Sequence, residues 1–385
     1  MKDPQIATAK SSSRQKSIEA SLKLQLVQGI GPRVFGELIQ RFDSAENVLS
    51  ATPQQLREVP GVGTKLMQHI VNADAQADVA GLLELCRDKG ISILDRGSTS
   101  YPKMLAEIYD PPNILFHQGT IEPVDQLAIA IVGTRHSSNY GDTVTRRLAH
   151  GLSMAGFTIV SGLARGIDAQ AHKAALAAKG RTIAVLGGGL LKMYPSEHQK
   201  LANEIAENGA VISEALPQQS PQAGCFPRRN RIVTGLSLGV IVVEAGDRSG
   251  AAISARLAME QGSEVFAVPG RIDSQNSRGC HQLIRDGATL VRSVDDVLEQ
   301  LGPLVDAIPC ESAPGKTPET IKHPAELKLS DQERAILQAI RSEPTAFDDI
   351  MQQTGLPASR LLSTISVLEV RRLIRRLSST SFVRN

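Results

Sequence analysis

Short apolar runs recur between Leu127 and Leu290, and alanine-rich segments of helical length separate them. Uninterrupted apolar strands that alternate with helices are typical of a parallel sheet covered by helices on both faces. The pattern therefore predicts an α/β fold with a doubly wound, mostly parallel sheet. The expected strands are 127–133, 157–161, 181–187, 210–214, 239–244, 263–268 and 288–291, and the expected helices are 141–155, 166–179, 196–208, 228–236, 250–261, 279–286 and 294–301.

The pattern before this sheet is helical. Polar, serine-rich residues 1–17 are predicted to form a disordered tail. Within residues 18–87, Gly29-Ile30-Gly31 and Gly61-Val62-Gly63 each precede a helical pattern, and the repeat resembles the helix-hairpin-helix motif. The amides of such a turn suit a phosphate, but a helical domain that serves only for packing explains the repeat equally well.

The remaining boundaries follow from proline and from helical periodicity. Residues 88–302 are assigned to the sheet domain, with a short strand expected at 114–116. Proline-rich residues 303–326 are predicted to be a linker. Residues 327–385 show three helical patterns and a terminal strand, the outline of a winged-helix-like domain. Its basic residues Arg371, Arg372, Arg375 and Arg376 are placed at the end of the third helix, where solvation of a charged helix end is the alternative to DNA contact.

The composition removes several classes of protein. Hydrophobic residues make up 41% of the 385 residues, enough for a sizeable core, and the net charge of +2 indicates no partner by itself. The four cysteines form no CxxC pair, which disfavours a zinc site or a disulfide framework. The sequence contains no signal-peptide pattern and no apolar run long enough for a membrane span. The expectation is a cytoplasmic protein without a membrane partner.

Candidate binding residues cluster at the carboxyl ends of the predicted strands, where ligands of doubly wound sheets bind. Glycine there lets backbone amides approach an anion, arginine suits phosphate, and hydroxyl groups donate hydrogen bonds. A helix is expected to begin after each loop, with its positive end toward the ligand. The first two strand ends supply Gly133, Thr134, Arg135 and Ser138, and then Ser161, Gly162, Arg165 and Gly166.

Further candidates follow the later strands. The ring of Phe226 can stack on a base while the neighbouring arginines hold phosphates, as in proteins that bind single strands. The alternative explanation of this segment is a charged surface cluster without a ligand. Tyr194, after Gly187–Gly189, offers a second stacking face, and Glu244 is expected to be buried and to bond loop amides. The binding residues assigned to these loops are Lys192, Phe226, Arg228, Arg229, Asn230, Arg231, Ser249 and Gly250.

Candidate catalysts are few. Asp168 and His172 lie four residues apart on one predicted helix, which suits a general-base pair, but a helix cap beside a structural histidine is the favoured explanation. The motifs of serine hydrolases, zinc proteases and P-loop NTPases are absent. The sequence therefore predicts a binder of a polyanion, with no catalytic residues, metal or cofactor.

An ordered set of motifs strongly resembles the DNA-processing protein A family, also called DprA or Smf. The resemblance covers roughly residues 98–300, and members often carry flanking helical and winged-helix-like domains. The motifs are VGTRHSSNYG, SGLARGIDAQAHKAAL, TIAVLGGGL with Tyr194-Pro195, Ser213-Glu214, FPRRNR, VVEAGDRSG, VPG and LIRDGA. The resemblance implies an extended Rossmann-like core that forms homodimers and has no enzymatic activity.

The resemblance also implies a function and assigns residues to it. Members bind single-stranded DNA, protect incoming strands during natural transformation and recombination, help displace single-strand-binding protein and load RecA. The family's GSRxxS loop matches Gly133, Thr134, Arg135 and Ser138, its SGxARGxD loop matches Ser161, Gly162, Arg165, Gly166 and Asp168, and its FPxRNR segment matches Phe226, Pro227, Arg229, Asn230 and Arg231.

Some positions depart from the family pattern. Ser196 stands where many members carry lysine, Gln222-Ala223-Gly224 lack a basic residue, and Ser254 replaces threonine. Lys192, Arg228 or Arg248 are candidates to restore the missing charge. Two other functions stay open: a nucleotide phosphoribohydrolase of the cytokinin-activating type, and a dimer platform whose terminal domains bind duplex DNA.

Overall fold

The computed structural model describes residues 4–73, 77–247, 249–306, 331–340, 344–370, 373–378 and 381–384. The chain divides into two compact units. One comprises residues 1–118, 186–193 and 211–225, and the other comprises residues 119–185, 194–210 and 226–385.

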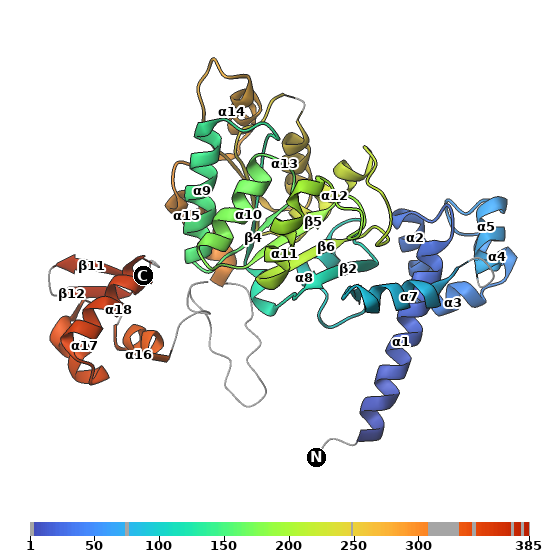
Figure 1. Ribbon diagram of the computed structural model, residues 1–385, viewed down its shortest axis with the longest axis horizontal. Coiled ribbons are helices and arrows are strands. Elements are labelled where there is room, and N and C mark those ends of the chain that lie inside the picture. Colours follow the sequence, from blue (N-terminus) through green and yellow to red (C-terminus); the bar gives the residue numbers. More distant parts are fainter. Residues whose placement is uncertain are drawn as a thin grey trace. The chain divides into compact units, whose positions relative to one another are not determined.

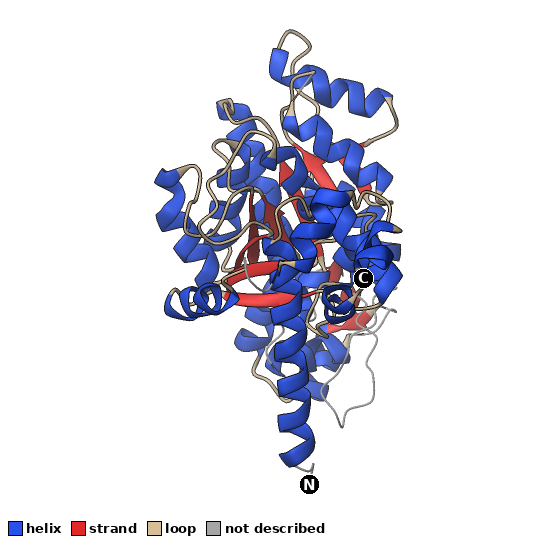
Figure 2. Cartoon of the chain, turned by 90° about the vertical axis from the view of Figure 1, so that its right-hand side faces the viewer, coloured by secondary structure: helices blue, strands red, loops and turns tan. Residues whose placement is uncertain are grey.

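The predicted sheet is present, with nine strands in the order β1-β2-β6-β5-β4-β3-β7-β8-β9. The pairs β5–β4, β4–β3, β3–β7, β7–β8 and β8–β9 are parallel, and β1 and β2 pair antiparallel. Figure 2 shows helices on both sides of these strands. The strands are β1 (Ser92–Asp95), β2 (Ile114–Gly119), β3 (Ala128–Val132), β4 (Thr158–Ser161), β5 (Thr182–Leu186), β6 (Gly209–Ser213), β7 (Gly239–Val242), β8 (Glu264–Ala267) and β9 (Thr289–Leu290).

Helices connect the parallel strands, and the strand order reverses between β3 and β7. From β3 the chain proceeds through β4 and β5 to β6, and it then crosses back to β7. Right-handed crossovers place the first three connecting helices on one face and the later ones on the other; Figure 1 shows α9 and α10 side by side. The helices are α9 (Asn139–Met154), α10 (Ile167–Ala177), α11 (Gln199–Glu207), α12 (Cys225–Gly235), α13 (Gly250–Glu260), α14 (Arg278–Arg285) and α15 (Val294–Asp306), with 3-10 turns η1 (Pro123–Gln126), η2 (Ser196–His198) and η3 (Gln275–Ser277).

Every strand and helix predicted between residues 127 and 301 is confirmed, with ends that differ by a few residues. The reason is that β3, β4, β5 and β7 are buried along their whole length, so their sequences are mostly apolar, with threonine or serine only at some strand ends. The strand expected at 114–116 is also confirmed as β2. The short elements β1 and α8 (Lys103–Glu107) carry no such pattern and were not predicted.

The N-terminal helices contain both predicted hairpin turns. Gly29 and Gly61 have φ angles of 102° and 87°, a conformation that favours glycine. Gly31 and Gly63 then precede α2 and α5 as their N-caps. These helices enclose their own apolar core, with Leu24, Leu38, Val48 and Leu56 at its centre. The helices are α1 (Pro4–Leu26), α2 (Pro32–Phe42), α3 (Ala45–Ser50), α4 (Pro53–Arg57), α5 (Thr64–Val71) and α7 (Val79–Asp88).

Two expectations for the terminal segments require correction. From Pro4 onward the polar tail is helical rather than disordered, since residues 5–17 contain no glycine or proline and several good helix formers. The third C-terminal helix ends at Val370 instead of continuing through the arginines, because Ile374 and Phe382 are buried in a hairpin. Arg375 and Arg376 therefore lie on a strand.

This C-terminal domain has its own core and a three-stranded sheet in the order β10-β12-β11. The predicted linker overlaps the end of α15, and its residues from 307 onward lie outside the described residues, as do Arg371 and Arg372. In the part of the chain that the structure describes, no helix is both long and apolar enough to cross a bilayer. The elements are α16 (Asp331–Ala339), β10 (Thr345–Ala346), α17 (Phe347–Thr354), α18 (Ala358–Val370), β11 (Ile374–Ser378) and β12 (Ser381–Arg384).

Candidate functional site

Glu244 links the two strand ends at which the strand order reverses. It follows β7, has a φ of 66° and is buried. Its carboxylate accepts hydrogen bonds from the Ser138 amide at 2.9 Å and from the Ser138 hydroxyl, and its carbonyl accepts the Thr134 amide at 2.8 Å. The prediction that Glu244 is buried and bonds loop amides is confirmed. It fixes the loop after β3 at the switch point of the sheet, where ligands of this fold bind.

Ser138 also begins α9. Its hydroxyl oxygen accepts the Gly141 amide at 3.1 Å as the N-cap of the helix. Gly141 must be a glycine, because a Cβ there would overlap the Glu244 carboxylate. The Ser138 hydroxyl is therefore held by the protein itself, and its role is to orient the loop that carries Arg135.

The loop after β4 packs against the loop after β3. Gly166 has a φ of 73°, and a Cβ on it would meet the backbone of Thr134 and Arg135. The Ile167 amide donates to the Thr134 carbonyl at 3.2 Å. The Ser161 hydroxyl donates to the Ile131 carbonyl at 2.6 Å and is buried, so it ties neighbouring strands together. The glycines and hydroxyls predicted for these two loops thus build a rigid edge beneath Arg135 and Arg165.

Arg229 lies beneath this edge and is buried. Its Nη1 donates to the Gly162 carbonyl at 2.6 Å and to the Val185 carbonyl. Gly162 leaves the room that this guanidinium occupies. Burial raises the pKa of the nearby Asp168 carboxyl, and the charge of Arg229 opposes that shift. Arg229 therefore holds the ends of β4 and β5 from inside.

The other members of the FPRRNR segment have different environments. Arg231 is also buried, whereas Arg228 is exposed. Asn230 accepts the Arg229 Nε at 3.1 Å and donates to the Gly250 carbonyl at 3.2 Å, so it joins α12 to the start of α13. The structure therefore differs from the prediction that all these side chains face phosphates, because α12 is enclosed on more than one side and both Arg229 and Arg231 are buried along it.

His172 and Asp168 do not form the general-base pair that their spacing suggests. The His172 Nδ1 lies 2.7 Å from the Thr182 hydroxyl, which itself donates to the Ile159 carbonyl. Burial lowers the pKa of His172 to about 3, so the ring is neutral. Asp168 accepts the Ala164 amide at 3.3 Å instead of capping α10. Both side chains serve the structure of the loop and sheet.

Four exposed or partly exposed side chains form what we call the ring-and-arginine strip: Arg135, Phe226, Tyr194 and Arg165. The Arg135 guanidinium lies 5.1 Å from the centre of the Phe226 ring, and the Phe226 and Tyr194 rings are 6.0 Å apart in an edge-on arrangement. The Arg165 guanidinium lies 5.9 Å from the Tyr194 ring and pairs with Glu197 at 2.6 Å. Two adjacent rings therefore lie between two cations along this surface.

Tyr194 was not among the assigned binding residues, although the sequence marked it as a stacking face. Half of it is exposed, at 47%. The signal in the sequence was an aromatic residue in a chain with only 3% aromatic residues. Its proximity to Phe226, which lies 32 positions later, depends on how the loops meet in space.

The remaining predicted positions are more dispersed. Gly188 and Gly189 pack against residues 216–221, where a Cβ would overlap Pro221 or Leu216, so they serve loop packing. Lys192 is exposed after this loop. Ser249 caps α13 by accepting the Ala252 amide at 3.3 Å, and Gly250 has open space around it. Arg248 lies outside the described residues.

Three family models match this chain. The model described as DNA recombination-mediator protein A matches residues 92–302, a DprA winged helix domain matches 320–379, and a SAM-like helix-hairpin-helix tandem matches 21–73. Protein Smf of Synechocystis is 35% identical over 374 residues, which cover 90% of this chain and 94% of that protein. DNA processing protein DprA of Bacillus subtilis is 43% identical over 221 residues, covering 57% of this chain and 74% of that protein.

Solved structures give the same result. The crystal structure of DprA from Streptococcus pneumoniae matches with a TM-score of 0.66 and 35% identity, covering 74% of this chain and 97% of that one. A DprA structure from Helicobacter pylori, described as showing a single-stranded DNA binding mode, matches with a TM-score of 0.50 and 34% identity, covering 55% of this chain and 95% of that one. The core model alone matches more than half of the residues, and the chain therefore belongs to the DNA recombination-mediator protein A family, whose members are named DprA or Smf.

Proposed function

We propose that this protein binds single-stranded DNA along the ring-and-arginine strip. The observation that carries the proposal is a pair of adjacent rings, Phe226 and Tyr194, with Arg135 at one end and Arg165 at the other. Aromatic faces accept bases of any sequence, and the arginines beside them accept the flanking phosphates. An unpaired strand offers both groups, whereas the bases of a duplex are stacked away from such rings.

The loops beneath the strip support its cations. The Glu244 carboxylate already occupies the start of α9, whereas the start of α13 has open space at Gly250, and Arg135 is exposed on the loop after β3. Gly133, Thr134, Gly162 and Gly166 shape these loops. In this proposal Arg135, Arg165 and Arg228 contact phosphates, while Arg229 and Asn230 hold the loops in place.

The family supports a wider role for this binding. The relative from Helicobacter pylori is described by its single-stranded DNA binding mode, and the matching core model names a recombination mediator. We infer that this chain, acting as a homodimer in the cytoplasm, protects incoming single strands, helps displace single-strand-binding protein and loads RecA during transformation or recombination. Its action is binding rather than catalysis.

Anisotropy of fluorescein-labelled oligo(dT) tests the binding surface. Phe226→Ala removes one stacking face and is expected to weaken binding by about 1–3 kcal/mol. Arg135→Ala is expected to weaken binding and to reduce the slope of log K against log salt by about 0.7, the value for one phosphate on a single strand. Arg285→Ala, at an exposed arginine on α14, is the matched control. If both strip variants keep the oligo(dT) affinity and the salt slope of the wild type, the strip is not the binding surface.

A second measurement tests the role in recombination. RecA hydrolyses ATP when it assembles on single strands, so its rate on strands precoated with single-strand-binding protein reports loading. The wild-type chain is expected to raise that rate, and Phe226→Ala is expected to raise it less. Incubation with nucleoside monophosphates tests the enzyme hypothesis, because release of a free base would support a phosphoribohydrolase instead.

A further inference from the structure

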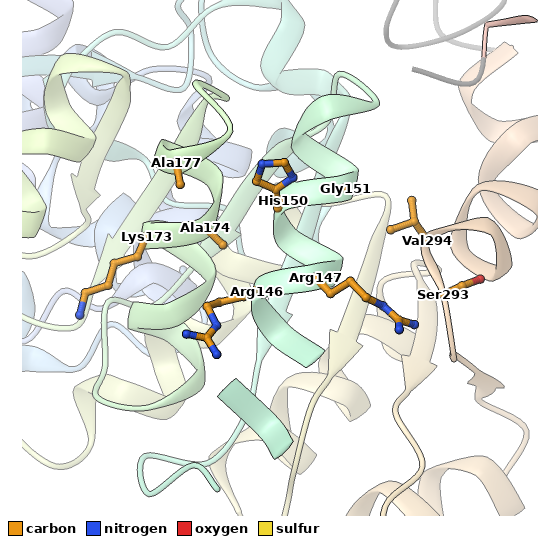
Figure 3. A pocket seen from close by; sticks show the side chains of 9 residues that line it. All are labelled: Arg146, Arg147, His150, Gly151, Lys173, Ala174, Ala177, Ser293 and Val294. Atoms are coloured by element: carbon orange, nitrogen blue, oxygen red, sulfur yellow. The ribbon is translucent and has the colours of Figure 1, made fainter. Parts of the chain in front are cut away.

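A second concave surface lies along α9 and α10, away from the strip. It encloses about 810 Å³ and also involves the segment that begins α15. Figure 3 shows its lining side chains, with Arg147 extending toward Ser293 and Val294 and Arg146 toward α10. Arg146 lies seven residues beyond the first residue of α9, which is roughly 10 Å along the helix axis. We call this surface the α9–α10 groove.

The rim of the groove is positively charged. Arg146, Arg147, His150 and Lys173 all line it and are exposed. None of the four takes part in an ion pair among the described residues. Arg146 donates to the Thr143 hydroxyl at 3.3 Å, and Arg147 donates to the Arg292 carbonyl. These bonds are to uncharged groups, so neither of them supplies a counter-charge.

Asp296, in the first turn of α15, is already engaged. Asp296 accepts the amides of Arg292 and Ser293 at 2.7 and 2.9 Å and pairs with the Arg292 guanidinium at 3.3 Å. It therefore compensates Arg292 rather than the rim. A protein that leaves several cations together around one concavity presents a site of positive potential, which suits an anionic ligand.

The floor of the groove is apolar and lined by small side chains. Gly151 and Ala174 line it from α9 and α10, with the exposed Ala177 at its edge and Val294 on one side. Gly151 lets Val294 pack closely against α9, because a Cβ there would come within 2.7 Å of the Val294 Cγ2. The amides of residues 146–151 and 173–177 lie within helices, so they are not available to a ligand. An aliphatic or aromatic side chain fits such a floor, and a phosphate does not.

We propose that the α9–α10 groove binds an acidic peptide segment of a partner protein, with an apolar side chain on the floor and carboxylates at the rim. A nucleic acid fits less well, since no phenylalanine, tyrosine or tryptophan is among the lining residues and the floor offers no donors. The combination of an apolar anchor and flanking charges is how short acidic motifs are recognised. This inference does not depend on DNA binding at the strip.

Anisotropy of a fluorescein-labelled octapeptide of alternating aspartate and leucine, with the full-length protein, tests the proposal. A second octapeptide of alternating aspartate and serine keeps the charge and removes the anchor. The leucine peptide is expected to bind at least about tenfold more tightly, because only it buries apolar surface on the floor. Equal binding of the two peptides would overturn the role of the floor.

Two variants locate the binding. Arg146→Glu/Lys173→Glu reverses two rim charges and is expected to lower the affinity for the leucine peptide by about tenfold or more. Arg256→Glu/Arg285→Glu makes the same change of charge at two exposed positions on α13 and α14 and is expected to have little effect. Ala177→Trp fills the floor without changing charge and is expected to abolish the difference between the peptides.

Other outcomes contradict the proposal. Equal losses in the rim and control variants would mean that binding follows net charge alone. Failure of the peptide to bind, together with loss of oligo(dT) binding in the rim variant, would assign the groove to nucleic acid. Circular dichroism melting of each variant separates these results from misfolding, and oligo(dT) affinity at the strip is expected to be unchanged in the Ala177→Trp variant.

Discussion

Arg229 is a buried cation whose partners are all internal. Its guanidinium donates to the Gly162 and Val185 carbonyls, and its charge acts on the buried Asp168. If the Arg229 guanidinium is removed, the Asp168 carboxyl stays buried without a cation and two carbonyls lose their donor. The resulting loss in the free energy of unfolding is larger than the stability that the intact group adds. The residue therefore shapes the sheet edge from inside, and under the proposed function this is its route to an effect on DNA binding.

Arg229→Ala is expected to lower the free energy of unfolding by about 3 kcal/mol, measured by urea denaturation. Arg228→Ala, at the exposed neighbouring position, is expected to change it by less than about 0.5 kcal/mol. The double variant Asp168→Asn/Arg229→Met keeps the volume and removes both charges, so it is expected to recover part of the loss. Equal stability of Arg229→Ala and the wild type would show that the buried bonds contribute nothing.

His172 is expected to make stability depend on pH. In the folded protein burial lowers its pKa to about 3 from the usual 6.5. Between these values the unfolded chain takes up a proton that the folded protein excludes. The free energy of unfolding is therefore expected to fall as pH falls below 6.5, by up to about 1.4 kcal/mol per pH unit from this residue.

The measurement is a series of urea titrations between pH 7 and pH 4. His172→Gln is expected to flatten the pH dependence, whatever its stability at pH 7, because it has no proton to bind. His150→Gln, at an exposed position, is the matched control and is expected to leave the slope as it is in the wild type. A slope that His172→Gln leaves intact would assign the dependence to other groups.

At the scale of the element, α9 begins at a junction between two strand ends. Ser138 caps this helix and also donates to the buried Glu244 carboxylate, whereas Ser249 caps α13 without a carboxylate. The two caps are chemically the same. Only the first one connects its helix to the neighbouring strand.

Ser138→Ala is expected to destabilise the protein by roughly 2–3 kcal/mol, the cost of a cap plus a lost bond to a buried charge. Ser249→Ala is expected to cost about 1 kcal/mol, the cap alone. Thermal and urea denaturation compare the two. If both variants lose the same amount, the Ser138–Glu244 bond adds no stability of its own.

Element order was largely predictable, and the exceptions have a physical cause. Buried parallel strands require apolar runs, and those runs in the sequence predict β3 to β9. The segment 374–378 was predicted to be helical because its pattern continues that of α18. Pairing of β11 with β12 overrides that local preference by burying Ile374 beside Phe382.

For the whole molecule, the three regions have separate cores. The described N-terminal helices and C-terminal elements each enclose their own apolar cluster. The described residues of the strip belong to the Rossmann-like core alone. The binding function proposed for the strip therefore does not require the C-terminal domain.

A chain that ends at Asp306 is expected to melt at nearly the temperature of the full-length core and to keep its oligo(dT) affinity within about twofold. Duplex DNA is measured alongside, since the alternative function assigns DNA contact to the terminal domains. If the truncated chain no longer binds single strands, the binding site lies in residues 307–385. Melting of the core at a clearly lower temperature would show that the domains depend on each other.

The sequence by itself determined the doubly wound sheet, the flanking domains and the segments that hold the candidate binding residues. It did so because apolar periodicity and turn glycines are local properties of the chain. Only the tertiary structure decided which arginines face solvent. Arg135 and Arg165 lie over rings at the sheet edge, while Arg229 and Arg231 are turned inward by α12.

The strip itself is a product of tertiary structure. Arg135, Arg165 and Tyr194 come from three separate loops and Phe226 from the first turn of α12, and no spacing in the sequence reveals that they meet. They meet because parallel strands deliver their carboxyl ends to one edge, and because buried groups such as Glu244 fix the loops there. The sequence supplied residue types suited to a single strand, and packing decided their order along it.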